Sequence, residues 1–458
     1  MRIVILGAGQ VGSSVAHHLS GEGSNEITLV DLRENLLRKL QDLLDIRTVR
    51  GNAALPSVLQ SAGVDQADML IALTSSDEVN FLACEVANAL FRVPIKVARI
   101  RSAAYLNHPH LFAPEALAVD VLINPEQLVT DYILRVIENV GASQVVDFAD
   151  GLVRLVAVRA YRGGPLVGQR LRTLSEHMPG IETRVAAIFR HQRPILPEGD
   201  TVVEPGDEVF FIIARQHIQA MMGELRRLER PLKRIIVAGG GNIGTRLTQA
   251  LAGDYQVKVI EKDRERARTA AERMPRTLVL TGDAGDEELL REENIEHTDL
   301  FCAVTNDDEA NILSSMLART LGARLVLALV NRPAYVGLVE EGRIDIAVSP
   351  QQATISGLLA HIRRGNVVKV HSLRHGTAEA IEAVVPTDRP NPRLVGRRVE
   401  QIPLPRGASI TALVRGERLL AAHHDSRVEA GDHVILFLTD RRRIQEVERL
   451  FQSGVKPT

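Results

Sequence analysis

The sequence predicts an α/β protein made of two tandem copies of one two-domain unit. In each copy a parallel-sheet domain precedes a small α+β domain. Two observations predict this fold class: the chain repeats its own motifs at a nearly constant offset, and apolar strands alternate with helical patterns before a β-rich stretch begins. A chain of 458 residues is too long for one ordinary hydrophobic core, so two to four domains are expected.

The internal repeat is visible in motifs that recur about 230 positions later in the chain. GAGQVG at Gly7 to Gly12 recurs as GGGNIG at Gly239 to Gly244, and ADMLIALTSSDEVN recurs as TDLFCAVTNDDEAN. The later parts repeat as well, because LVGQRL recurs as LVGRRV and VEPGDEVFFI as VEAGDHVILF. A nearly constant offset along each half indicates tandem duplication of a whole two-domain unit.

The first parallel-sheet domain is expected from alternating strands and helices, the pattern of βαβ units. The expected strands are RIVILG, EITLVD, IRTVRG, MLIALT, IKVARI and AVDVLIN. Helical patterns lie between or after them at Val11–Leu19, Asn35–Leu43, Glu78–Leu90 and Glu126–Asn139.

The small domain is expected where the pattern becomes β-rich and is interrupted by GG, PEGD and PGD turn signals. Its expected strands are LVRLVAVRA, TRVAAIFR and EVFFIIA, followed by a helix at about 217–228. We therefore divide the chain into a nucleotide-binding domain at 1–140, a small domain at 141–229, and their repeats at 230–365 and 366–458.

Each glycine motif follows an apolar strand, opens a helix and precedes a second strand that ends in an acidic residue. This is the full context of a Rossmann-like dinucleotide site, whose helix start attracts phosphates. The acidic residues Asp31 and Glu261 would accept hydrogen bonds from ribose hydroxyls and repel a 2′-phosphate, which favours NAD(H) or an adenine nucleotide over NADP. The motif positions are Gly7, Ala8, Gly9, Gln10, Val11 and Gly12, and Gly239, Gly240, Gly241, Asn242, Ile243 and Gly244.

The loops after the fourth strands, at the carboxyl edge of each sheet, are further candidate contacts. They carry Thr74 and Ser75 in the first copy and Thr305 and Asn306 in the second. The spacing of Ser75 to Glu78, and of Asn306 to Glu309, predicts helix N-caps with their reciprocal partners. A residue of these loops can cap a helix and also contact a ligand. The carboxylates of the loops, such as Glu78 and Glu309, therefore need no catalytic role. The repeated segments RGNA and TGDA add Asn52 and Asp283 as candidates.

One difference between the copies concerns positive charge. Arg99 and Arg101 are two positions apart and are expected on one face of a strand that points to the ligand edge. The second copy has Leu329 and Asn331 at these positions. The first pocket should therefore hold more negative charge than the second, unless Arg99 only forms a surface ion pair.

Composition and charge argue against several classes of protein, namely nucleic-acid-binding, membrane-spanning and metal-binding proteins. A net charge of −2 gives no electrostatic case for nucleic-acid binding. The first residues predict a strand, so a signal peptide is not expected, and no apolar run approaches the ~20 residues that cross a bilayer. The histidines lack thiolates or carboxylates at metal-ligand spacing, so no metal site is expected. No catalytic constellation recurs in both copies; the alternative kept open is an NAD-dependent oxidoreductase.

The motifs GAGQVG, DMLIALTSSDEVN, KVARIRS, INPEQLV, NDDEANI, SPQQATIS and GDHVILFLTD resemble the regulatory components of bacterial Trk potassium uptake, which carry RCK or KTN domains (regulators of potassium conductance). The resemblance covers essentially the whole chain. It implies NAD(H) and ATP or ADP as ligands, with contacts at the glycine loops, Asp31, Thr74, Ser75 and Arg99, and at Glu261, Thr305 and Asn306.

The same resemblance implies a peripheral protein on the cytoplasmic face of the inner membrane. It implies a ring-like homo-oligomer beneath an integral membrane potassium channel of TrkH or TrkG type. On this reading the chain is a nucleotide-sensing subunit, not an enzyme, and Leu329 puts the phosphate contact of the second pocket in doubt.

Overall fold

The computed structural model describes the chain of 458 residues except for a few short segments. The segments left out are 22–24, 114–115, 192, 227–229, 333, 336–338, 340–343, 363–365, 375–376, 388–390, 392, 441–442 and 452–458. The expected domain ends at 229 and 365, and the end of the helix expected at 217–228, lie outside the described residues. The chain divides into two compact units, Met1–Leu128 with Gln351–Ile362, and Val129–Pro350 with Arg363–Thr458.

The first unit contains a six-stranded parallel sheet with strand order β3-β2-β1-β4-β5-β6. This order reverses direction between β1 and β4, where ligands bind in open α/β sheets. The strands are β1 (Arg2–Leu6), β2 (Glu26–Asp31), β3 (Arg47–Arg50), β4 (Met69–Ala72), β5 (Ile95–Arg99) and β6 (Val121–Ile123). The helices are α1 (Gln10–Ser20), α2 (Glu34–Leu43), α3 (Pro56–Ser61), α4 (Asp77–Phe91), α5 (Ala103–Leu106) and the start of α6 (Pro125–Glu138).

The central strands are apolar because helices cover both faces of a parallel sheet. All four residues of β4 are buried, as are the last four of β1. The core between this sheet and its helices includes Leu6, Leu70, Cys84 and Ala87. Burying thiols among apolar side chains raises the pKa of Cys84 to about 12, so this cysteine packs as a small hydrophobic residue.

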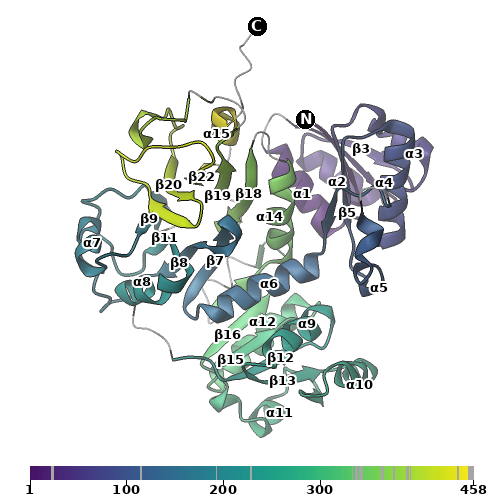
Figure 1. Cartoon of the computed structure of the whole chain (residues 1–458). Helices are drawn as coiled ribbons and strands as arrows, with labels where there is room; N and C mark the ends of the chain where they lie inside the picture. Colours follow the sequence, from purple (N-terminus) through teal and green to yellow (C-terminus); the bar gives the residue numbers. More distant parts are fainter. Residues whose placement is uncertain are drawn as a thin grey trace. The chain divides into compact units, whose positions relative to one another are not determined.

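A helix from the second half of the sequence belongs to the first unit. Helix α14 (Pro350–Ile362) contacts α1 through a hydrogen bond of 2.7 Å from Ser14 Oγ to Gln351 Oε1. The two helices lie side by side in Figure 1, α14 in green and α1 in purple. The sequence alone predicts that α14 packs with the second copy, in which it lies along the chain. Only the tertiary structure shows that it packs in the first unit.

The second unit repeats the parallel sheet with the order β14-β13-β12-β15-β16-β17. The pairing register repeats too, because Arg2 pairs with Glu26 as Arg234 pairs with Gln256. The strands are β12 (Arg234–Ala238), β13 (Gln256–Glu261), β14 (Leu278–Thr281), β15 (Leu300–Ala303), β16 (Leu325–Leu329) and β17 (Ile346–Val348). The helices α9 (Asn242–Leu251), α10 (Arg264–Arg273), α11 (Glu287–Glu292) and α12 (Asp308–Thr320) surround it (Figure 1).

The same unit holds two antiparallel sheets of five strands with equivalent orders, β10-β9-β11-β8-β7 and β21-β20-β22-β19-β18. The first consists of β7 (Ala142–Phe148), β8 (Val153–Arg159), β9 (Thr183–Arg190), β10 (Arg193–Ile195) and β11 (Glu208–Ala214), with α7 (Leu174–His177) and α8 (Ile218–Leu225). The second consists of β18 (Val367–Leu373), β19 (Ala378–Val384), β20 (Ala408–Arg415), β21 (Arg418–Ala421) and β22 (His433–Leu438), with α15 (Ile444–Phe451).

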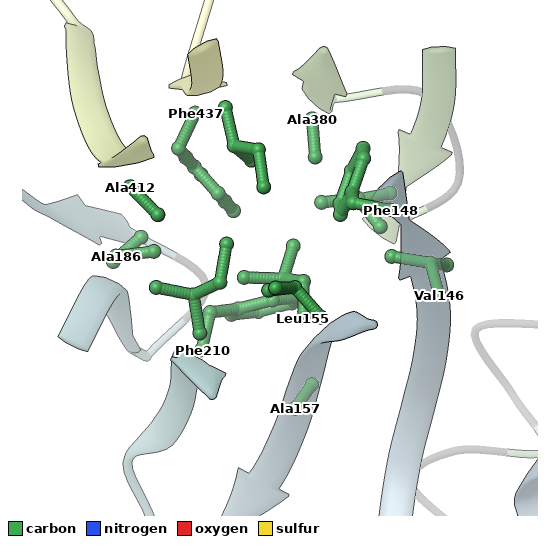
Figure 2. Close-up of a cluster of buried hydrophobic side chains, with 14 of the residues drawn as sticks. Val146, Phe148, Leu155, Ala157, Ala186, Phe210, Ala380, Ala412 and Phe437 are labelled. Atoms are coloured by element: carbon green, nitrogen blue, oxygen red, sulfur yellow. The ribbon is translucent and has the colours of Figure 1, made fainter. Parts of the chain in front are cut away.

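The two antiparallel sheets share one hydrophobic core, drawn in Figure 2. The rings of Phe210 and Phe437, one from each sheet, are 5.4 Å apart in an edge-to-face arrangement. Phe148 and Ala380 are completely or almost completely buried in the same cluster. Aromatic contacts of this kind add to the burial of apolar surface, so each small domain supplies part of the core that stabilises the other.

The fold class expected from the sequence is confirmed: two parallel α/β sheets alternate with two antiparallel sheets. The expected helices of the first copy agree with α1, α2, α4 and α6 to within one residue at each end. Strand β7 was missed because ASQVVDF mixes polar and apolar residues next to an expected boundary. Within the part of the chain that the structure describes, none of the helices combines the length and apolar character needed to cross a bilayer.

Candidate functional site

The first glycine motif forms the turn between β1 and α1. Gly7 has a φ of +101°, which favours glycine, and a Cβ on Gly12 would lie 1.8 Å from the Gly7 carbonyl oxygen. A Cβ on Gly9 would meet no atom within 4 Å. Two glycines are therefore required by the fold of the turn, whereas Gly9 faces open space that a ligand could occupy.

The amino end of α1 has the features of an anion-binding site. Gly9 is the N-cap residue and supplies no side-chain cap, and the first turn contains no acidic residue. Ala8 is buried next to it, while Gln10 and Val11 start the helix. Unpaired backbone N–H groups and the helix dipole both favour negative charge at such an end.

Asp31, the last residue of β2, is tied to this turn. Its Oδ2 accepts a hydrogen bond of 2.7 Å from the Ala8 N–H, and its Oδ1 accepts one of 2.8 Å from the Arg33 N–H. Burial alone would raise the pKa of Asp31, but the hydrogen bonds from Arg33 and Ala8 hold the pKa below its ordinary value. The carboxylate is thus kept ionised as a hydrogen-bond acceptor beside the glycine loop.

The second glycine motif has the same construction. Gly239 has a φ of +113°, and a Cβ on Gly244 would lie 1.8 Å from the Gly239 carbonyl oxygen. A Cβ on Gly241 would meet nothing within 4 Å. Glu261 Oε2 accepts a hydrogen bond of 2.7 Å from the Gly240 N–H. Asn242 and Ile243 begin α9, as Gln10 and Val11 begin α1.

Thr74 lies at the carboxyl end of β4 and is held by a residue that the sequence analysis missed. Asn80 is fully buried, and its Oδ1 accepts hydrogen bonds from the Thr74 N–H (2.9 Å) and the Thr74 hydroxyl (2.7 Å). Asn80 Nδ2 donates to the carbonyl oxygens of Thr74 (3.3 Å) and Arg99 (2.8 Å). This one amide therefore fixes the ends of β4 and β5 relative to each other.

Asn311 does the same in the second copy. Its Oδ1 accepts hydrogen bonds from the Thr305 N–H (2.9 Å) and hydroxyl (2.7 Å), and its Nδ2 donates to the carbonyl oxygens of Thr305 and Leu329. The repeated motif already contained both asparagines, in TSSDEVN and TNDDEAN. Their recurrence at the same position of both copies was the signal that could have identified them.

The helix caps expected at Ser75 and Asn306 are wrong by one residue. Ser76 Oγ accepts the Val79 N–H at 3.2 Å, and Asp307 Oδ1 accepts the Ala310 N–H at 2.9 Å. In a run of consecutive cap-forming residues the spacing to the next glutamate does not identify the cap. Ser75 and Asn306 are exposed at the sheet edge, free of the capping role assigned to them.

The carboxylates next to these caps are structural. Asp77 is buried, and its Oδ2 accepts hydrogen bonds from the backbone N–H groups of Arg101 (3.0 Å) and Ser102 (2.8 Å). Asp308 makes the equivalent bonds to the loop after β16. These contacts position the loops after β5 and β16 and leave little reason to assign the carboxylates to acid–base chemistry.

Arg99 is the last residue of β5 and is half-buried. Its Nε is enclosed by protein and has no hydrogen-bond partner among the described residues. Burial lowers the pKa of its guanidinium, and the nearby charge of Arg101 lowers it further. Arg101 lies just beyond the strand and donates to the Ser75 carbonyl oxygen at 2.5 Å. The two arginines are thus close together at the edge of the first pocket.

The second pocket lacks this charge. Leu329 is buried at the position of Arg99. Asn331, at the position of Arg101, donates to Asp308 Oδ1 through its backbone and side-chain nitrogens at 2.8 and 2.9 Å. Arg332 forms an ion pair with Glu309 at 2.6 Å, which balances its charge locally.

The two remaining candidates, Asn52 and Asp283, follow β3 and β14. Asn52 Oδ1 accepts the Ala54 N–H at 3.0 Å, and Asp283 Oδ1 accepts the Gly285 N–H at 2.9 Å. The hydrogen bond from Lys262 holds the pKa of Asp283 below its ordinary value. Both side chains stabilise turns at the outer side of their sheets.

In each copy these residues form a row along the carboxyl edge of the parallel sheet: an acid after one strand, the glycine loop, then a threonine held by asparagine. Such a row provides hydrogen-bond acceptors for a ribose at one end and backbone donors for phosphates in the middle. Among the described residues, no group of three or more His, Cys, Asp and Glu side chains could hold a metal ion.

The families that match this chain correspond to its parallel and antiparallel sheets in turn. Residues 3–125 and 235–350 match the TrkA-N domain, and residues 155–226 and 385–452 match the TrkA-C domain. The chain is 58% identical over 455 residues to the "Trk system potassium uptake protein TrkA" of Halomonas elongata, covering 99% of both chains. It is 54% identical to the protein of the same name from Vibrio alginolyticus, again covering 99% of both.

Solved structures agree at the level of the fold. The GsuK RCK domain superimposes with a TM-score of 0.60 at 17% identity, covering 98% of this chain and 94% of that one. The GsuK channel bound to NAD gives a TM-score of 0.60 at 17% identity and covers 98% of this chain and 78% of that one. With both domain types matched twice and relatives more than half identical over the whole length, the chain belongs to the family of Trk system potassium uptake proteins TrkA.

Proposed function

We propose that this chain is a nucleotide-sensing regulatory subunit that gates a Trk-type potassium uptake channel, with one nucleotide pocket in each parallel-sheet domain. The observation that carries the proposal is the pair of glycine loops, each hydrogen-bonded through its backbone to the acid of the neighbouring strand, Ala8 to Asp31 and Gly240 to Glu261. The domains of the proposal are 1–140, 141–229, 230–365 and 366–458.

The ligands we assign to the pockets are NAD(H) and the adenine nucleotides ATP and ADP. Asp31 and Glu261 offer carboxylate oxygens to a ribose diol, and the amino ends of α1 and α9 offer N–H groups to the phosphates. Glu261 also accepts the Asp263 N–H at 2.9 Å, so the second acid is oriented much as Asp31 is. One solved structure of the same fold is described as the GsuK channel bound to NAD.

The site residues in this proposal are those at the pocket edges. In the first pocket they are the glycine loop with Asp31, Thr74, Ser75, Arg99 and Arg101, and Asn52 at the outer end. In the second they are its glycine loop with Glu261, Thr305 and Asn306, and Asp283 at the outer end. The extra charge of Arg99 and Arg101 favours the more anionic ligand in the first pocket.

The proposed partner is an integral membrane potassium channel of TrkH or TrkG type, and the proposed assembly is a ring of copies of this chain at the cytoplasmic face of the inner membrane. An assembly surface must be exposed on the single chain. Leu82 on α4 is 50% exposed, and Leu313, at the equivalent position of α12, is 65% exposed. Two equivalent apolar helix faces suit a ring in which both copies make contacts.

The proposed mechanism is a population shift. A nucleotide changes ion flux only if it binds two ring shapes unequally, and the difference in binding free energy is what drives the channel. Helix α6 starts at the edge of the first pocket and leads to the antiparallel sheet of the first copy, so it is the covalent route by which a pocket reaches the small domain.

The pockets are tested separately with one substitution each. Gly9→Val and Gly241→Val place a side chain in open space, at φ values of −69° and −72° that valine adopts, so the fold should be retained. Calorimetry on the full chain should show nucleotide binding to two pockets, reduced to one by either substitution and abolished by both. Unchanged binding in the double variant would contradict the assignment of the pockets.

The oxidoreductase alternative is tested with the same preparation. A dehydrogenase must supply a proton donor beside the nicotinamide, and no such role is part of this proposal. We expect the NADH absorbance to stay constant in the presence of candidate carbonyl substrates. Turnover that is lost in the Gly9→Val variant would replace the regulatory function with an enzymatic one.

A further inference from the structure

In the interface between the two antiparallel sheets, the residue after the first strand of each sheet contacts the opposite sheet. In the first small domain this residue is Ala149, directly after β7, and its N–H donates to Glu382 Oε2 on β19 at 3.0 Å. Glu382 is 1% exposed, and its Oε1 lies 2.5 Å from His433 Nδ1 on β22. A buried carboxylate of the second small domain thus accepts a backbone hydrogen bond from the first.

Arg374 makes the reciprocal contact from the second small domain. It directly follows β18, and its Nη1 forms an ion pair with Glu208 Oε2 on β11. Its guanidinium carbon lies 4.2 Å from the centre of the Phe189 ring on β9. Glu208 is held from its own domain as well, because its Oε1 accepts the Ser143 hydroxyl at 2.8 Å. The side chain of Arg374 is 15% exposed, so the ion pair is only weakly screened by water.

These contacts are made from equivalent positions of the two copies. The equivalent residues are Ala149 and Arg374, Ala157 and Glu382, and Glu208 and His433. The members of each pair are 225 positions apart, and the pairing of β8 with β11 has the same register as that of β19 with β22. The backbone is alike too, since φ is +45° at Ala149 and +46° at Arg374. The two small domains therefore present different side chains from the same places.

The side chains are complementary in size across the interface. The first small domain has a short side chain both after its first strand and at the strand position, Ala149 and Ala157, and Ala157 is fully buried in the shared core (Figure 2). The second small domain has long side chains at both places, Arg374 and Glu382. Because each domain contacts the opposite sheet, Arg374 lies over the sheet that carries Ala157, and Ala149 lies against Glu382. Packed interfaces contain few voids, so this arrangement matches a long side chain with a short one on each side.

Two small domains of the first type would not match in this way. Ala149 would face Ala157, so the interface would lose packed volume. Glu208 would lack the guanidinium group that now pairs with it. A cavity and a poorly solvated carboxylate without its cation both destabilise an interface.

Two small domains of the second type would be overpacked. Arg374 would then face Glu382 and His433. The position of Phe189 would be taken by Val414, which offers no ring to the guanidinium group. Extra volume in a packed interface forces side chains out of their preferred rotamers.

We propose that these six residues form a pairing code, by which a small domain of the first type fits one of the second type and does not fit its own type. When copies of the chain assemble, each pair of small domains then joins one domain of each type, from the same chain or from two chains. Each pair is connected along the chain to one parallel-sheet domain of each copy. The inference goes beyond the proposed function and does not depend on nucleotide binding.

The experiment exchanges the pairing code in the full chain. One like-type chain carries Ala149→Arg, Ala157→Glu and Glu208→His, the other carries Arg374→Ala, Glu382→Ala and His433→Glu, and the exchanged chain carries all six substitutions. Hydrogen exchange of the Phe210 and Phe437 amides, in the central strands β11 and β22, measures how often the paired domains open. Each like-type chain should lose at least ~30-fold of this protection, because a cavity or a clash is combined with unpaired polar groups.

The exchanged chain should recover, because every contact of the code returns with the two domains interchanged. We expect protection within ~5-fold of wild type, since only the contact with the Phe189 ring is not transferred. Six independent effects would instead lower protection further than three. An exchanged chain that is not at least ~10-fold better protected than both like-type chains overturns the pairing code. So does a like-type chain that keeps the protection of the wild type.

A smaller set of variants tests the same complementarity at Ala149. Ala149→Arg should lower protection ~10-fold, because the new side chain meets Glu382. Adding Glu382→Ala should restore most of it, since it provides the room that Ala157 leaves on the other side, whereas a further loss of protection contradicts the code. Asp150→Asn is the matched control in the same turn: its side chain is 96% exposed, and protection should stay within ~2-fold.

Discussion

Asn80 holds Thr74 through three hydrogen bonds, two accepted by its side-chain oxygen and one donated by its nitrogen. The same nitrogen also donates to the carbonyl oxygen of Arg99, so the amide joins the two strand ends that border the first pocket. Asn311 repeats this arrangement in the second copy, which makes it a property of the duplicated unit rather than of one site.

Replacing Asn80 with alanine should destabilise the first parallel sheet. The change leaves buried backbone groups of Thr74 and Arg99 without partners, at about 1–3 kcal/mol for each, and we expect a total near 3 kcal/mol. Hydrogen exchange of the β4 and β5 amides measures this loss locally, which suits a chain of several domains. Ser75→Ala is the control, because the exposed side chain should change stability by less than about 0.5 kcal/mol.

His371 should make the shared core of the small domains sensitive to acid. Burial, together with the charges of Arg135 and Lys369, lowers the pKa of His371 to about 4, although the contact with the Asp147 carbonyl opposes this shift. The unfolded chain binds a proton near pH 6.5, so stability is complete above that pH and is lost as the pH falls toward 4.

Between pH 7 and pH 5 this histidine should reduce the free energy of unfolding by about 2 kcal/mol. Urea unfolding followed at both pH values measures the change, and His371→Leu should remove most of it. An equal pH dependence in the variant would mean that other groups cause the acid sensitivity. The ring of Phe148, 5.1 Å from the histidine ring, should still pack against leucine.

Asp207 should contribute strongly to the first small domain. It is 1% exposed, and its two carboxylate oxygens accept hydrogen bonds of 2.9 Å from Arg190 Nε and Nη2. Asp207→Asn removes the carboxylate charge that pairs with Arg190, although Glu204 and the Val202 carbonyl oxygen still accept hydrogen bonds from this arginine, so the cost should be about 1–3 kcal/mol. Asp200→Asn is the matched control: Asp200 is mostly exposed in its pairs with Arg170 and Arg172, and such pairs contribute at most about 1 kcal/mol.

Asp31 should link the stability of the first parallel-sheet domain to pH in a lower range than His371 does. The pKa of Asp31 is lower in the folded protein than in the unfolded chain, so its contribution to stability is present above about pH 4 and is lost as the pH falls below that value. Asp31→Asn should flatten this part of the stability profile and weaken nucleotide binding at pH 7. Loss of binding without any change in the acid profile would show that the Arg33 and Ala8 contacts do not stabilise the fold.

The fold could be predicted from the sequence because its signals are local and occur twice. Apolar runs such as IVIL and MLIA are required because these strands are buried on both faces of the sheet. The glycine motifs identify the turns in which Gly7 and Gly239 adopt a positive φ. Where the sequence pattern of an element is weak in one copy, the same pattern in the other copy supports its prediction. Acid, glycine loop and threonine were found in this way.

The rest depends on tertiary contacts that leave no periodic signal. A buried polar residue on a helix, such as Asn80, resembles a surface residue until its partners on two strands are known. The cap at Ser76 could not be separated from Ser75, since both residues form caps equally well. The place of α14 in the first unit and the core shared by Phe210 and Phe437 join residues more than 200 positions apart.

The most direct test of the central claim is calorimetry of NADH, ATP and ADP on the nucleotide-free full chain, with Gly9→Val, Gly241→Val and the double variant in parallel. We predict two binding events per chain, one lost in each single variant and both lost in the double variant, with every variant folded by circular dichroism. Folded wild-type protein that takes up none of the three nucleotides would contradict the account.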